Sequence, residues 1–255
     1  NVQRGFHRLT LLTFSCFFIF FLLLPEKVFP VNFTVNPVRI FFDGRNRTNI
    51  LTIKNEDEES VTLQLRAYAW KQDEKGENIY SPTKDIIFFP KIVTIKKGEE
   101  KIIRLGTNLS RDEHEQTYRL YIEEIPGPGT TESTAVRIIM KVGVPIFISP
   151  LKVDAQGSIE KKEVQKGKLY FEVKNNGNIH FIIRAVNVKG NDASGKEAFK
   201  TAIGGGYLHG GSSKGFTVEI PTENCLKMNN LEINIDTDRL SLIEKLNVLK
   251  EMCTL

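Results

Sequence analysis

The side chains that most often carry chemistry are dispersed along this sequence. No histidine has a second histidine or a cysteine at the spacing of a metal-binding set. The acidic run 56–59 lacks the spacing of a calcium-binding loop and is better explained as a solvated turn. The glycine-rich stretch 204–211 opens neither a helix nor a phosphate-binding motif, so a flexible loop is expected there. The sequence therefore predicts no enzyme activity, no metal site and no cofactor; the histidines considered are His7, His114, His180 and His209.

Two cysteines, Cys225 and Cys253, follow the apolar N-terminal stretch, which itself holds Cys16. An exported chain meets oxidising conditions, in which such a pair can form a disulfide. Spacing alone does not show that the two side chains meet, so a bridge and two free thiols both stay open. No C-x-x-C pair occurs, and neither a thioredoxin-like site nor a zinc knuckle is indicated.

The N-terminus has the pattern of a secretory signal peptide. Arg4, His7 and Arg8 precede an apolar run from Leu9 to Leu24, and Pro25 ends it. A retained membrane anchor is the alternative, but the run is shorter than the ~20 residues that span a bilayer. Residues 1–30 are therefore expected to be removed on export.

The charge balance is close to neutral. The chain carries a formal charge of +4, and the first thirty residues hold three basic side chains against one acidic one, which leaves +4 − 2 = +2 for the remainder. This excess is too small to indicate binding to nucleic acid or to an anionic membrane surface.

One apolar row stands out on the stretch from Ser133 to Pro150, which is predicted to be a single long strand. Successive side chains of a strand point to opposite faces. One face holds a mixed set that includes Arg137, Ile139 and Lys141, and the other is apolar throughout. This row either faces the protein's own core or is available to a second chain, and alternation alone does not decide; it comprises Val136, Ile138, Met140, Val142 and Val144.

Short strands separated by turns must position this long one. Before it, alternation predicts strands at Val38–Phe42, Asn49–Lys54, Val61–Trp70, Ile86–Phe89, Ile92–Ile95, Lys101–Leu105 and Tyr118–Ile125. After Pro150 it predicts strands at Leu169–Lys174, Ile179–Lys189, Phe216–Ile220 and Leu231–Ile235. Leucine and isoleucine at helical spacing predict a short helix over Leu240–Met252. The fold class is therefore all-β, with two β-sandwich domains at 31–149 and 150–255.

Six segments, in this order and spacing, resemble one known family. They are NPVRIFFDG (36–44), IIFFPKIVTIKKGEEKIIRL (86–105), YRLYIEEIPG (118–127), VPIFISP (144–150), VKNNGNIHF (173–181) and GGGYLHGGSSKGFTVEIP (204–221). Together they are similar to the periplasmic chaperones of the chaperone–usher pathway, which assemble pili and fimbriae. The Val-Pro-Ile-Phe ending resembles the archaic or divergent branch. The resemblance implies two immunoglobulin-like domains in an L-shaped arrangement.

The resemblance also implies a mechanism, donor-strand complementation, in which the chaperone lends its long strand to a pilus subunit that lacks one. The donor row falls on Val136, Ile138, Met140 and Val142. Family members also hold the subunit's C-terminal carboxylate with two basic residues, and Arg39 matches the first of them. The position of the second is Pro145 in this chain, so Lys141 and Arg104 are considered as substitutes.

The implied partners are pilus subunits and an outer-membrane usher. Self-capping by dimerisation is also expected, because an empty apolar edge invites aggregation. Two alternatives differ in class: a secreted structural or adhesive β-sandwich surface protein, and an exported enzyme or metal carrier. The first would bury the apolar row within itself, and the second would need a convergent polar pocket.

Overall fold

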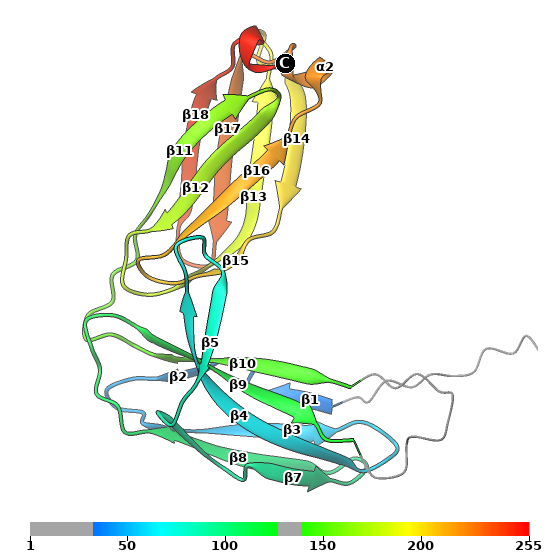
Figure 1. Cartoon of the computed structure of the whole chain (residues 1–255), viewed down its shortest axis with the longest axis vertical. Coiled ribbons are helices and arrows are strands. Elements are labelled where there is room, and N and C mark those ends of the chain that lie inside the picture. The colour runs from blue at the N-terminus through cyan, green and yellow to red at the C-terminus, as the bar shows by residue number, and fades with distance from the viewer. Residues whose placement is uncertain (1–32, 127–138, 255) are drawn as a thin grey trace, which may run out of the picture.

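The computed structural model describes residues 33–126 and 139–254, which form two β-sandwiches that meet at an angle (Figure 1). The expected signal peptide at 1–30 lies outside these residues, and so do Val136 and Ile138 of the apolar row. The two sandwiches and the angle between them confirm the predicted all-β class with two immunoglobulin-like domains in an L-shaped arrangement. Among the described residues, no helix is long and apolar enough to cross a membrane.

The first sandwich consists of two facing sheets. One has the strand order β1 (Phe33–Asn36), β3 (Thr48–Asn55), β8 (Glu100–Thr107) and β6 (Ile86–Phe89). The other has the order β2 (Ile40–Phe42), β10 (Lys141–Ile148), β9 (Gln116–Glu124), β4 (Val61–Gln72) and β5 (Asn78–Pro82), and β7 (Ile92–Ile95) also pairs with β4. All neighbours are antiparallel except β2 and β10, which run parallel.

Alternation explains why these strands form. In β4, Val61, Leu63 and Leu65 are buried, and in β9 so are Leu120 and Ile122, while the residues between them are at most half-buried. Period-two apolar residues can bury one face against the opposite sheet, which is what drives a sandwich together. The predicted strands of this half are present, and alternation missed β1 and β5 because both are short and largely exposed.

The second sandwich is built in the same way. One sheet has the order β11 (Gly157–Gln165), β12 (Lys168–Asn175) and β16 (Ser213–Glu219). The other has the order β14 (Glu197–Ile203), β13 (Phe181–Asn191), β17 (Asn230–Thr237) and β18 (Ser241–Asn247), and β15 (Gly206–Leu208) pairs with β13. A one-turn helix α2 (Thr222–Cys225) and a 3₁₀ turn η1 (Lys250–Met252) lie at the far end.

The helix predicted over Leu240–Met252 is wrong. Residues 241–247 form β18, which is antiparallel to β17 with Leu246 opposite Leu231. Ile243, which the helical spacing would place on the apolar face, is 57% exposed. Pairing along the full length of β17 outweighs a weak local preference for helix, as often happens at the edge of a sheet.

A disulfide joins Cys225, at the end of α2, to Cys253, just after η1, with 2.03 Å between the sulfurs. Both cysteines belong to the core of the second sandwich, where they are 1% and 2% exposed. The bridge ties the last residues of the chain to the connection between β16 and β17.

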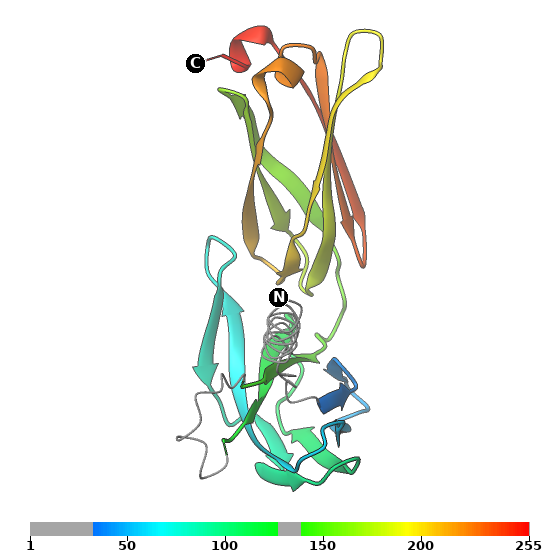
Figure 2. The ribbon, with the colours of Figure 1, turned by 90° about the vertical axis from the view of Figure 1, so that its right-hand side faces the viewer.

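Contacts from both sandwiches fix the junction between them. The Arg111 guanidinium donates to three successive carbonyls, those of Ser149, Pro150 and Leu151, with 3.1 Å to the first and to the third. Glu115 of the first sandwich and His180 of the second are both buried, and Oε2 lies 2.6 Å from Nδ1. The β4–β5 hairpin rises beside β15 in both views of the molecule (Figures 1 and 2).

Candidate functional site

The apolar row of β10 emerges gradually from the core of the first sandwich. Ile148, Ile146 and Val144 are 2%, 0% and 2% exposed. Val142 and Met140, which continue the row towards the N-terminus, are half-buried and pack against the rim of the same core. The described part of the row therefore faces the sandwich interior, and its cover thins towards the segment that holds Ile138 and Val136.

One edge of β10 is open over most of the strand. β9 pairs with β10 along the whole of Lys141–Ile148, but β2 pairs only with Ile146, Phe147 and Ile148. Within the described part of the chain, no strand lies beside the other edge from Lys141 to Pro145. An open edge presents backbone hydrogen-bonding groups to which another chain can add a strand.

The outward face of β10 is crossed by side chains from β9. A Cβ built on Gly143 would lie only 2.9 Å from Arg119 Cδ and 2.9 Å from Tyr121 Cε1. The glycine therefore lets these two side chains lie across the strand. Farther along, the ring of Phe147 stacks on that of His180, with 3.8 Å between centroids, so the second sandwich touches β10 directly.

The three basic residues singled out in the sequence lie apart. Arg39 is exposed, directly before β2, and its positive charge acts on the Tyr207 hydroxyl at the junction of the sandwiches. Lys141 begins β10, 3.9 Å from Glu123 and 4.6 Å above the Tyr121 ring. Arg104 lies on β8 in the other sheet, opposite Ile50 and Phe89. Only Arg39 is therefore at the junction.

A fourth basic residue, Arg119, lies at the junction, and the sequence reasoning missed it. Arg119 is directly opposite Pro145 across β9 and β10. Its guanidinium carbon is 4.0 Å from the Trp70 ring centroid and 5.9 Å from that of Tyr207. Alternation in YRLYIEE places Arg119 outside the core, but register between strands is not readable from one sequence, so its pairing with Pro145 was hidden.

Rings from both sandwiches surround this arginine. Trp70 contacts His209 and Tyr207, with centroids 4.4 Å and 5.1 Å apart. Burial raises the pKa of the Tyr207 hydroxyl, while the charges of Arg39 and Arg119 act in the opposite direction. Burial, with further effects from His180 and Arg119, lowers the pKa of His209 to about 3, so its ring is neutral at pH 7. The positive charge that acts on Tyr207 therefore comes from Arg39 and Arg119.

The comparisons with known proteins agree with this architecture. Residues 32–154 match the family model for pili and flagellar-assembly chaperones, PapD N-terminal domain. The match spans the first sandwich, from β1 to β10, and not the second. The resemblance seen in its sequence segments is thereby confirmed. No curated protein matches the sequence significantly.

Solved structures share the fold of this chain at low sequence identity. A chain of the CsuC–CsuE chaperone–tip adhesion subunit complex from the archaic Csu pili of Acinetobacter baumannii is 20% identical, with 73% of this chain and 90% of that one covered and a TM-score of 0.51. The CupB2 chaperone of Pseudomonas aeruginosa is 15% identical (85% and 100% covered, TM-score 0.53). A chain of the Salmonella enterica SafA pilin–SafB chaperone complex is 14% identical (88% and 100%, TM-score 0.54).

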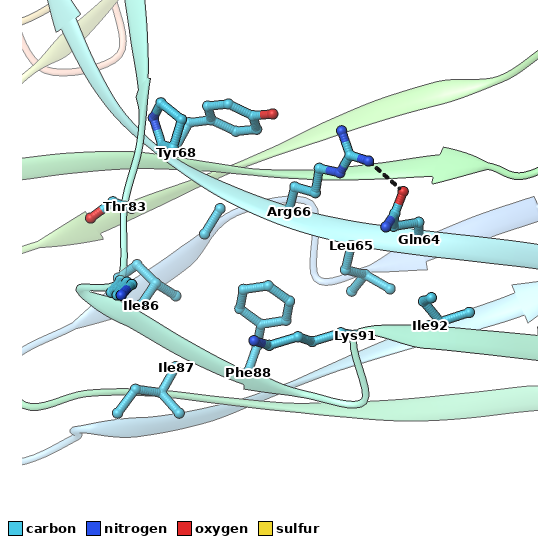
Figure 3. A pocket seen from close by; sticks show the side chains of 13 residues that line it. Gln64, Leu65, Arg66, Tyr68, Thr83, Ile86, Ile87, Phe88, Lys91 and Ile92 are labelled. Carbon is cyan, nitrogen blue, oxygen red and sulfur yellow. Dashed lines mark hydrogen bonds between the residues drawn. The ribbon is translucent and has the colours of Figure 1, made fainter.

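The first sandwich also has a cavity of about 740 Å³ between β4 and the β6–β7 segment. Figure 3 shows Leu65, Ile86 and Phe88 between the strands, while Arg66 turns to the other side of β4 and donates to Gln64 Oε1 at 2.8 Å. The lining is mostly apolar and includes no carboxylate. Across the described residues, no group of three or more His, Cys, Asp or Glu side chains could hold a metal ion. The cavity thus lacks a convergent polar set.

Proposed function

We propose that this chaperone captures an incomplete pilus subunit by lending it β10 and the segment that precedes β10. The open edge from Lys141 to Pro145 is the observation that carries the proposal. A client that lacks one strand of its own sandwich could add its backbone there and complete its sheet. β10 remains anchored meanwhile, because its last three residues, Ile146 to Ile148, are paired on both sides.

The donor row is proposed as Val136, Ile138, Met140 and Val142. The half-burial of Met140 and Val142 supports this, since the same side chains could cover a client's groove where the chaperone's own core thins out. Full burial of an aliphatic side chain contributes about 1.5–3 kcal/mol. Four such residues would supply enough free energy to hold a client through assembly.

Arg39 is proposed to bind the client's C-terminal carboxylate. It is exposed, and it lies one residue before the stretch where β2 pairs with β10. A guanidinium can grip a carboxylate with two parallel hydrogen bonds. Lys141 and Arg104 were the other candidates; Lys141 is on the same sheet, whereas Arg104 is on the opposite one.

The wider assignments are part of the same proposal. Delivery to an outer-membrane usher, a periplasmic location, residues 1–30 as a signal peptide and domains at 31–149 and 150–255 all accord with membership of this family. Solved relatives include a pilin–chaperone complex and a chaperone–tip adhesion subunit complex, which supports a pilus subunit as the client. Self-capping by dimerisation is proposed for the empty chaperone because its edge is open.

A self-contained adhesive sandwich is the competing function. The packing of Met140 and Val142 on the chain's own core is what favours it. In such a protein the row would serve only the interior, and a charge placed there would destabilise the fold without removing any partner. A charge in the row would therefore abolish client binding in a chaperone, and would unfold a self-contained adhesive sandwich.

The test is substitution in the donor row, measured with the chain co-expressed beside the pilin-like proteins encoded next to it. Ile138→Asp is expected to reduce recovery of the subunit with the chaperone at least tenfold, because a carboxylate cannot enter an apolar groove unpaired. Ile139→Asp is the matched control, since the neighbouring residue faces the other way and is 50% exposed.

A second control is Ile243→Asp on β18, an exposed residue on the last strand of the other sandwich. Both controls are expected to recover the subunit as the wild type does. Normal recovery with a correctly folded Ile138→Asp protein would contradict the donor role. Unfolding of Ile138→Asp in the absence of any client would instead favour the self-contained sandwich.

A further inference from the structure

We propose that the outer face of the β1–β3–β8–β6 sheet is an interface between two copies of this chain. In this dimer the two sheets pack face to face, with Ile102 of each copy on Ile102 of the other and Arg104 of each opposite the partner's Glu100. β8 lies on the side of the first sandwich away from the second one (Figure 1). The interface is therefore separate from the junction and from the open edge of β10.

The outer face of this sheet is unusually apolar for a surface. An antiparallel sheet with one solvated face normally carries polar residues on that face. Four large apolar side chains are more than half exposed here, namely Ile50 (55%), Ile87 (53%), Phe89 (75%) and Ile102 (53%). They lie together, because Ile50 on β3 and Phe89 on β6 flank Arg104 of β8 on either side. A contiguous exposed patch of this kind marks an interaction surface.

Two charged residues lie on the same face of β8 at equal distances from Ile102. Glu100 comes two residues before it and Arg104 two residues after it, about 7 Å away in each direction. Both are exposed, and neither forms an ion pair or a side-chain hydrogen bond within residues 33–126 and 139–254. Lys54, which is opposite Glu100 on β3, is bound to Glu56 at 2.8 Å. The order acid, apolar, base is thus complementary to itself when the strand is reversed.

Twofold symmetry turns this pattern into matched contacts. In a twofold dimer both copies use the same surface. An axis that crosses β8 at Ile102 reverses the strand of the second copy, so that Arg104 faces the partner's Glu100 at two equivalent points. Packed sheets lie about 10 Å apart with their strands within about 30° of each other, a gap that an arginine and a glutamate side chain can bridge together. A different protein would have to supply a carboxylate at this position, whereas a second copy already carries one.

The shape of the face also suits a partner. An open hollow of about 560 Å³ lies beside Arg104 and is lined by Thr48, Asn49, Ile50, Arg104 and Leu105. Such a hollow admits a side chain from the opposite copy, which a flat sheet would not. Ile50 and Phe89 would exclude water from the charge pairs once the sheets meet, and this strengthens the attraction between opposite charges.

The location of the face has a consequence for client binding. β8 and β10 belong to opposite sheets of the first sandwich. A dimer formed through β8 leaves the edge from Lys141 to Pro145 uncovered in both copies, unlike a dimer that caps this edge. The inference does not rest on the proposed function, because the dimer forms without any client.

Sedimentation velocity of the mature chain, residues 31–255, measures the association. Specific interfaces at the small end of the size range are weak, so a reversible monomer–dimer equilibrium is expected at micromolar concentrations. Ile102→Asp places two carboxylates against each other on the axis and is expected to weaken the dimer at least tenfold. Ile243→Asp is the matched control, because Ile243 is 57% exposed on β18 of the other sandwich, and it is expected to dimerise as the wild type does.

Charge exchange tests the register of the interface. Arg104→Glu and Glu100→Arg each place like charges opposite each other at two points, and each is expected to weaken the dimer at least tenfold. The double variant Glu100→Arg, Arg104→Glu restores the opposite charges and is expected to dimerise within about threefold of the wild type. All variants are expected to keep the wild-type circular dichroism, because the substituted side chains are exposed.

Three outcomes would overturn the proposal. The first is a wild-type chain that stays monomeric at micromolar concentrations, whatever other protein binds this face. The second is a wild-type dimer that Ile102→Asp and both single charge reversals leave intact, because it would use another surface. The third is a double charge variant that dimerises as weakly as the single ones, because Arg104 would then not face the partner's Glu100.

Discussion

Each of the two sandwiches has a turn held by a buried asparagine with the same hydrogen bonds. The two differ in whether the edge of their last strand is protected against pairing with another chain. Asn55, at the end of β3, donates from Nδ2 to the carbonyls of Glu59 and Ile95. Asn175, at the end of β12, donates in the same way to Ile179 and Leu208. In each case the side-chain oxygen accepts from the amide two residues ahead. The same polar device thus closes equivalent turns in both halves.

The last strands of the two sandwiches, β10 and β18, differ in the charge along their edges. β18 is an edge strand that carries Glu244 and Lys245, which form ion pairs of 3.2 Å with Lys162 and Glu232. Charged residues of this kind discourage another strand from adding to an edge. The open stretch of β10 has only Lys141 at its start, followed by Val142, Gly143 and Val144. The comparison indicates that the open edge of β10 is a local feature and not a general property of this fold.

The largest expected effect comes from breaking these asparagine turns. Asn55→Leu and Asn175→Leu each leave two carbonyls and an amide without their partner; these groups are buried around Asn175 and partly buried around Asn55, and an unpaired buried group costs about 1–3 kcal/mol. Each variant is expected to lose about 4 kcal/mol of unfolding free energy, measured by urea titration with Trp70 fluorescence and circular dichroism. Trp70 belongs to the first sandwich and also contacts Tyr207 and His209 of the second, so its fluorescence reports on the first sandwich and on the junction.

The exposed neighbour Asn176 supplies the control, since its side chain donates only to Ser158 Oγ at the surface. Asn176→Ala is expected to change the free energy of unfolding by less than about 1 kcal/mol. If Asn55→Leu were as mild as this control while Asn175→Leu was not, the two turns would not be equivalent and the comparison would break.

Removal of the disulfide should sharpen the difference between the halves. Cys225 and Cys253 are 28 residues apart, and closing a loop of that length is worth about 3.6 kcal/mol. The double variant Cys225→Ser, Cys253→Ser is expected to lower the unfolding midpoint of the second sandwich in circular dichroism, while the transition of the first sandwich stays in place. A shift of both transitions would show that the sandwiches unfold as one unit.

A smaller effect is expected from pH at the contact between the halves. The pKa of His209 is about 3 when folded and about 6.5 when unfolded, so the unfolded chain binds the proton first. Stability is therefore complete above pH 6.5 and falls as the pH drops towards 3, by about 2 kcal/mol between pH 7 and 5. Urea titrations at the two pH values measure this fall.

His209→Gln should remove that part of the pH dependence, because glutamine has no proton to bind in this range. His114, which is exposed, provides the control variant His114→Gln, which is expected to retain the wild-type slope. An unchanged slope in His209→Gln would mean that His209 takes up its proton equally well in the folded and unfolded chain.

Local alternation was sufficient to predict the long buried strands, because β4 and β9 present an uninterrupted apolar face to the core. It failed for β18, because Leu240, just before the strand, and Ile243 and Leu246 within it fit a helix as well as an edge strand. It could not show that Cys225 and Cys253 meet, or that Arg119 lies opposite Pro145. These features depend on register and on how distant segments pack, and neither is encoded in a short window of sequence.

The hydrogen bonds from Arg111 to the connection between the sandwiches bear on which substitutions that connection can accept during evolution. Its guanidinium reads only peptide oxygens, and every amino acid supplies one. Residues 149–151 could therefore be exchanged for others without loosening the bend, so long as the path of the main chain is kept. The angle between the two sandwiches therefore depends little on which side chains residues 149–151 carry.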